Sequence, residues 1–232
     1  KLGIPVHIYL PYDADPMKLK FLREWDAGIT YFDEIETARQ KALEASQNQR
    51  MTFISAYNNL NMVLGGGTVA VEILDQLPEA DMVLVPVGGG GLASGVGSYL
   101  KQIKPEIQVV AVQTENSPTF FEWFKARKAI SVNLKPSIAT GLSGYIEPET
   151  LTLPLFLDVV DQVVMVSETA MIRAMEWVLT THKMVVEPSG IAAVAALLSG
   201  KLDTANKTVV SILTGSNISS ARLTALIRPV EC

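Results

Sequence analysis

The chain has 232 residues, of which 48% are hydrophobic and 19% are charged, a composition that suits one large or two small globular domains with a full core. Its formal net charge of −5 excludes the basic surface typical of nucleic-acid-binding proteins, and no apolar run reaches the roughly 18–20 residues that span a bilayer. The single cysteine, Cys232, excludes an internal disulfide and predicts a reducing, cytoplasmic setting.

Strand-like and helix-like segments alternate through the first part of the chain. The expected elements are, in order, a strand at 6–10, a helix at 16–25, a strand at 29–32, a helix at 34–47 and a strand at 51–54. The pattern then breaks at 58–61. We therefore predict a smaller α/β domain at residues 1–57 and a larger domain at residues 58–232.

The second part continues the alternation with more apolar strands. The expected strands are 82–87, 108–112, 159–166 and 208–213, and the expected helices are 69–77, 91–103, 118–127, 168–181 and 189–198. Short apolar strands alternating with helices predict an α/β fold with a mostly parallel, twisted sheet covered by helices on both faces. Ligands of such sheets bind beyond the carboxyl ends of the strands.

One of these strands ends in four consecutive glycines, Gly88, Gly89, Gly90 and Gly91. Four glycines cost conformational entropy, and one glycine would suffice for a tight turn, so the loop predicts an anion site. The anion could belong to a dinucleotide, because residues 88–93 also fit the pattern G-x-G-x-x-A. The acidic residue that this alternative needs after the next strand is represented only by Glu115.

Four further segments accompany the glycine loop. They are Gly65-Gly66-Gly67-Thr68, Ser137-Ile138-Ala139-Thr140-Gly141-Leu142, Val185-Val186-Glu187-Pro188-Ser189-Gly190 and Leu213-Thr214-Gly215-Ser216-Asn217. Together, in this order, the five segments resemble the fold-type II pyridoxal-phosphate enzymes (tryptophan synthase β-like), in the threonine/serine dehydratase and serine racemase branch. Thr140 stands where the family pattern has an aspartate.

The resemblance implies a cofactor, pyridoxal 5'-phosphate, and a set of residues that bind it. The backbone amides of Gly88 to Leu92 would hold its phosphate, Thr214 would lie near the pyridine nitrogen, and Gly141 and Glu187 would lie near the cofactor. From the residues alone, Thr214 could equally cap a turn and Glu187 could be a helix N-terminal carboxylate. The implied substrate is a small hydroxy amino acid, serine or threonine, which β-elimination converts to a 2-oxo acid and ammonia, and the implied assembly is a homodimer.

The family's catalytic lysine is missing from the pattern. Its S-x-K-x-R-G motif does not occur, so no catalytic residue is predicted here, and the chain resembles only the later portion of the family, with residues 1–57 as the remainder of the small domain. Some members of the family present cation ligands at the positions of Gln113, Ser117 and Thr119. The acidic ligands are absent from these positions here, so no metal site is predicted. We expect an incomplete, inactive dehydratase chain. The alternatives are serine racemase-type activity, a nucleotide- or NAD-binding Rossmann-like module, and a non-catalytic fragment.

Overall fold

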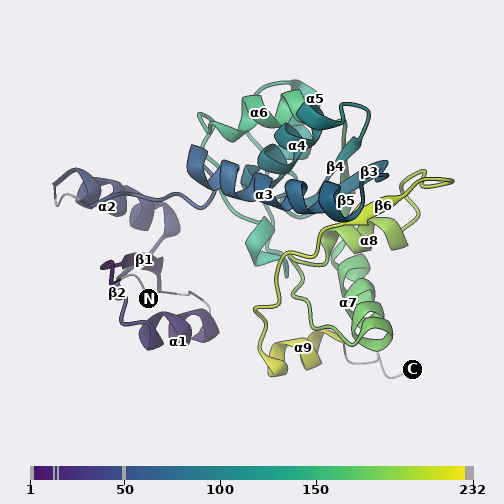
Figure 1. Cartoon of the computed structure of the whole chain (residues 1–232). Helices are drawn as coiled ribbons and strands as arrows, with labels where there is room; N and C mark the ends of the chain where they lie inside the picture. Colours follow the sequence, from purple (N-terminus) through teal and green to yellow (C-terminus); the bar gives the residue numbers. More distant parts are fainter. Residues whose placement is uncertain (1–2, 13, 15, 49–50, 228–232) are drawn as a thin grey trace. The chain divides into compact units, whose positions relative to one another are not determined.

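The computed structural model describes residues 3–12, 14, 16–48 and 51–227, which form two compact units, Lys1–Ile54 and Ser55–Cys232 (Figure 1). Within the first unit, the strands β1 (His7–Pro11) and β2 (Gly28–Phe32) pair in parallel, and each is followed by a helix, α1 (Pro16–Glu24) and α2 (Ile35–Asn48). The predicted strand at 51–54 is wrong, since these residues pair with no described strand.

The second unit is built on a four-stranded parallel sheet in the order β5-β4-β3-β6. Its strands are β3 (Met82–Pro86), β4 (Gln108–Thr114), β5 (Gln162–Val166) and β6 (Val209–Ser211). All five residues of β3 are buried, because helices cover both faces of a central parallel strand and its sequence is accordingly apolar without alternation.

Helices cover this sheet on two sides. One core cluster joins Val83 and Val85 of β3 to α3 (Leu60–Gln76), α4 (Gly91–Ile103), α5 (Thr119–Ala126) and α6 (Thr152–Val159). The other joins Met82 and Leu84 to α7 (Glu168–His182), α8 (Ala192–Leu198) and α9 (Ser220–Ile227). Successive side chains of a strand point to opposite faces. The predicted α/β fold, with a parallel sheet covered by helices on both faces, is confirmed.

The start of α3 differs from the prediction. We expected Gly65–Gly67 to precede a helix at 69–77, but the helix begins at Leu60, where the side chain of Asn59 accepts hydrogen bonds from two amides of the first turn. Two of the glycines serve helix packing instead: a Cβ on Gly67 would lie 3.1 Å from the carbonyl oxygen of Gly95 in α4, and one on Gly66 would lie 3.3 Å from Cα of Leu92.

Other elements also differ from the prediction. The strand β6 is shorter than predicted, β5 and α8 each begin three residues later, and α6 and α9 lie in segments for which no helix was predicted. Among the described residues, no helix is long and apolar enough to cross a membrane.

Candidate functional site

The four-glycine loop joins β3 to α4 and is tightly enclosed by other parts of the unit. Gly90, the N-cap of α4, has φ +83° and ψ −10°, a backbone conformation that is open to glycine and rare for other residues. A Cβ on Gly90 would lie 2.6 Å from the ring of Phe120, and one on Gly88 would lie 2.9 Å from the Gly141 carbonyl oxygen. A Cβ on Gly89 would overlap the ring of Tyr57. The loop therefore has steric as well as conformational reasons to be glycine.

A cavity of about 220 Å³ opens on this loop. Among the eight predicted site residues, seven line it: Gly88, Gly89, Gly90, Gly91, Leu92, Gly141 and Thr214. The other lining residues are Ala56, Tyr57, Pro86 and Leu142. Residues from four separate segments thus meet at the carboxyl end of β3, where an α/β sheet binds its ligands. Tyr57 was not predicted, because it belongs to no periodic segment.

Gly141 is held in the cavity wall by a buried hydroxyl. Its amide donates a hydrogen bond of 2.8 Å to Oγ of Ser189, a side chain that is 5% exposed. Ser189 lies in the 185–190 segment, so the sequence motif was the signal that could have identified it. On the other side, the Thr214 amide donates to the Gly190 carbonyl oxygen at 3.4 Å, and the Thr214 residue is exposed.

Glu187, the eighth predicted residue, does not line the cavity. Its carboxylate lies against Gly215, the neighbour of Thr214, and leaves no room there for a Cβ. Its backbone amide donates to the Gly215 carbonyl oxygen at 3.0 Å, and its carbonyl accepts from the amides of Gly190 and Ile191. Glu187 therefore contacts the segment that carries Thr214 at Gly215, without facing the cavity.

The cavity can attract an anion without a basic side chain. No lysine, arginine or histidine is among its lining residues. The attraction comes instead from backbone amides of the glycine loop and from the N-terminus of α4, whose first amides have no acceptor within the helix. A loop closed to side chains, backed by a 13-residue helix, fits a phosphate group.

Gln113 and Ser117, which occupy positions of possible cation ligands, have side chains buried within the protein. Oε1 of Gln113 accepts a hydrogen bond of 2.9 Å from the Phe121 amide in the first turn of α5. Its Nε2 and the hydroxyl of Ser117 are buried without a protein partner. In the described part of the chain, no group of three His, Cys, Asp or Glu side chains could hold a metal ion.

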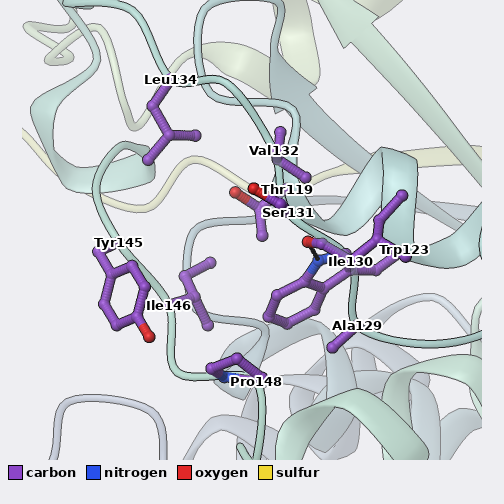
Figure 2. Close-up of a pocket in the computed structure, with 10 residues that line it drawn as sticks. All are labelled: Thr119, Trp123, Ala129, Ile130, Ser131, Val132, Leu134, Tyr145, Ile146 and Pro148. Carbon is purple, nitrogen blue, oxygen red and sulfur yellow. Dashed lines mark hydrogen bonds between the residues drawn. The ribbon is translucent and has the colours of Figure 1, made fainter.

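A second cavity, of about 430 Å³, is drawn in Figure 2. It shares no lining residue with the first. It is lined by Thr119, Trp123, Ala129, Ile130, Ser131, Val132, Leu134, Tyr145, Ile146 and Pro148. The indole N–H of Trp123 is already paired with the Ile130 carbonyl oxygen at 2.7 Å. Although it is larger, this cavity has no charged side chain and no helix N-terminus with a glycine loop among its lining residues, so the smaller cavity is the candidate site.

Comparison with known proteins gives matches along most of the chain. The family model described as "Pyridoxal-phosphate dependent enzyme" matches residues 1–215. The L-threonine ammonia-lyase of Thermotoga maritima is 36% identical over 220 residues, which are 93% of this chain and 54% of that protein. A serine racemase of Oryza sativa is 33% identical over 198 residues, 85% of this chain and 58% of that protein.

Solved structures give the same result. The structure of maize serine racemase superimposes with a TM-score of 0.89 at 31% identity, covering 96% of this chain and 69% of that one. The chain spans little more than half the length of the two relatives above.

Proposed function

Because this chain belongs to the pyridoxal-phosphate dependent enzyme family, we propose that it supplies the cofactor platform of an ammonia-lyase that acts on serine or threonine. The observation that carries the proposal is the convergence of the glycine loop, Gly141 and Thr214 on one cavity. The names of the relatives, L-threonine ammonia-lyase and serine racemase, support the choice of hydroxy amino acids as the substrate class.

The glycine loop is the proposed phosphate subsite. The amides of Gly88 to Leu92 donate hydrogen bonds to the phosphate oxygens, and the N-terminus of α4 adds the favourable end of its dipole. When bound, the cofactor withdraws electrons from the α-carbon of the amino acid and so makes its proton acidic. The residues of this chain bind and orient the group that does so.

Thr214 is the proposed partner of the pyridine nitrogen. A hydroxyl is neutral, so Thr214 would not stabilise a protonated ring nitrogen as a carboxylate would, and it would leave the bound ring a weaker electron acceptor. That setting suits loss of the β-hydroxyl after removal of the α-proton. Glu187 holds the backbone next to Thr214 in place through its contacts with Gly215.

The cavity lacks the lysine that this chemistry requires, since none of the described residues that line it is a lysine. We therefore propose that this chain binds the cofactor without a covalent bond and does not turn over substrate by itself. Racemisation is the second candidate activity, supported by the relatives that are named serine racemase. It needs the same binding residues and differs in where the proton returns.

The homodimer is also a proposal. Apolar side chains are exposed along α3, with Leu60 at 58% and Leu64 at 62% exposure, and covering them in a second copy would remove apolar surface from water. Light scattering after size-exclusion chromatography measures the mass directly. A monomer at all concentrations contradicts the dimer and leaves cofactor binding unaffected.

Thermal unfolding with added ligands tests the cofactor assignment. A ligand at a hundred times its Kd stabilises by about 2.7 kcal/mol, which raises Tm by about 5–10 °C for a unit of this size. We expect pyridoxal phosphate to give such a shift, NAD to give none, and borohydride treatment followed by peptide mass spectrometry to find no lysine of the chain labelled by the cofactor. Stabilisation by NAD alone would refute the proposal, and stabilisation by neither supports a non-catalytic chain.

A further inference from the structure

Thr152 makes an unusual contact for the first residue of a helix. The residue is completely buried, and its Oγ1 donates a hydrogen bond of 2.8 Å to the carbonyl oxygen of Gly89, 63 positions away in the sequence. It is not capping its own helix, because the N-cap residue of α6 is Leu151 and the Thr152 amide donates to Oγ1 of Thr150 at 3.4 Å. The proton of the Thr152 hydroxyl goes to the glycine loop, and its oxygen accepts from the Thr150 hydroxyl, 2.9 Å away.

This hydrogen bond fixes the orientation of one peptide group. A trans peptide is planar, with its C=O and N–H directed oppositely, and the described chain has no cis peptide bond. Once Thr152 holds the oxygen of Gly89, the N–H of Gly90 must point away from Thr152. Both glycines line the cavity, so this amide is one of those that a phosphate group can reach.

The backbone of Gly90 shows what the hydrogen bond selects. Its φ of +83° and ψ of −10° are those of the third residue of a type II turn. In the alternative type I turn the same residue has φ near −90°, and the two forms differ by rotation of the peptide between the second and third residues. Glycines offer little steric resistance to that rotation. An external hydrogen bond to the Gly89 oxygen therefore decides between the two orientations.

The segment that carries Thr152 is itself fixed by hydrogen bonds to Tyr57 and Asn58. Glu147 accepts hydrogen bonds from the hydroxyl of Tyr57 and, at 2.7 Å, from Nδ2 of Asn58. Oδ1 of Asn58 accepts from the Leu151 amide at 2.9 Å. The ring of Tyr57 in turn lies against Gly89. Gly89 is thus contacted both by the ring of Tyr57 and by the hydroxyl of Thr152.

We propose that Thr152 is a positioning residue that turns the Gly89–Gly90 peptide so that the Gly90 amide faces the cavity and donates to the bound phosphate group. The identity of that group rests on the proposed function, whereas the orientation of the peptide does not. Thr152 itself does not line the cavity, so it acts through the loop.

Three variants separate positioning from general stability. Thr152→Val removes the hydroxyl and keeps the shape, and Thr152→Ser keeps the hydroxyl. Thr114→Val is the matched control, because Thr114 is also completely buried and its hydroxyl pairs with Ser137 and Glu168 instead of the loop. All three use the full chain, and urea unfolding first establishes that each is folded.

The first measurement is the residual dipolar coupling of the Gly90 N–H in the chain without ligand. We expect Thr152→Val to change it and the other two variants to keep the parental value. The second measurement is the Kd for pyridoxal phosphate, determined from the fluorescence of the cofactor during a titration. Loss of one hydrogen bond to a charged group predicts a Kd increase of about tenfold or more for Thr152→Val alone, with Thr152→Ser close to the parent.

The outcomes are distinct. A parental Gly90 coupling in Thr152→Val overturns the positioning role, whatever the affinity. A changed coupling with an unchanged Kd also overturns the proposal, because the amide then does not contribute to binding. If the parent chain binds no pyridoxal phosphate, the proposed function fails, and the dipolar coupling still decides whether Thr152 orients the peptide.

Discussion

Replacing Gly90 with alanine tests whether the glycine loop is shaped by its surroundings. The left-handed conformation at φ +83° costs an alanine about 1–2 kcal/mol. The new Cβ would lie 2.6 Å from the ring of Phe120, which is completely buried and stacks against Phe156 at a centroid distance of 4.6 Å. Overpacking of this kind adds about 1–3 kcal/mol. We therefore expect Gly90→Ala to lower the free energy of unfolding by about 2–5 kcal/mol.

Gly200→Ala is the matched control, because Gly200 also has a positive φ, +66°, but a Cβ there would meet nothing within 4 Å. It should cost only the backbone contribution, about 1–2 kcal/mol. Urea unfolding followed by tryptophan fluorescence measures both, since Trp123 packs against Phe120. Equal losses in the two variants would refute the steric part of the reasoning. In thermal unfolding, Gly90→Ala should also lose the shift with pyridoxal phosphate, and Gly200→Ala should keep it.

Three further changes probe the cavity wall and the two units. Ser189→Ala removes the acceptor of the Gly141 amide, so we expect the free energy of unfolding in urea to fall by about 0.5–1.5 kcal/mol and pyridoxal phosphate to bind more weakly. Unchanged binding would show that Gly141 does not contribute to the site. Glu168→Gln replaces a carboxylate that accepts hydrogen bonds from one backbone amide and two hydroxyls, and it should lower the free energy of unfolding by about 1.5–3 kcal/mol in the same assay. An unchanged free energy would show that the carboxylate charge is unimportant. In α2, hydrogen bonds from Arg39 lower the pKa of Glu36, so this contribution to stability is present above the unfolded-state pKa and is lost as the pH falls through the folded-state pKa. Arg39→Gln should raise the pKa of Glu36 in an NMR titration, and an unchanged value would contradict that cause.

The sequence located the strands of the described residues and the glycine loop, because their signals are local, although it also predicted a strand at 51–54 that does not form. Buried parallel strands such as Met82–Pro86 are continuous apolar runs, and four successive glycines have few structural uses. Gly141 and Thr214 came from motif resemblance, and the structure brings both to the same cavity as the loop. Glu187 shows the limit of that reasoning, because a motif identifies a neighbourhood and does not specify which side chains face the cavity.

The errors share a physical cause, which is that they depend on contacts between distant segments. Gly65–Gly67 are typical of a loop in isolation, yet they belong to α3, where Gly66 and Gly67 pack closely against Leu92 and Gly95 of α4. The strand predicted at 51–54 has the right composition but no described partner strand. Thr152 and Tyr57 were missed because their roles depend on hydrogen bonds and ring contacts across tens of residues.

The proposed function separates cofactor binding from catalysis in this chain. The groups that shape the glycine loop, namely Phe120 beneath Gly90, Tyr57 against Gly89 and the hydroxyl of Thr152, all belong to the second unit. Phosphate affinity should therefore depend on how that unit is packed. Catalysis needs in addition a lysine within reach of the bound aldehyde, and none of the residues lining the cavity supplies one. Binding of pyridoxal phosphate and absence of turnover are consequently compatible outcomes for this chain, and only the first of them measures whether the loop is correctly built.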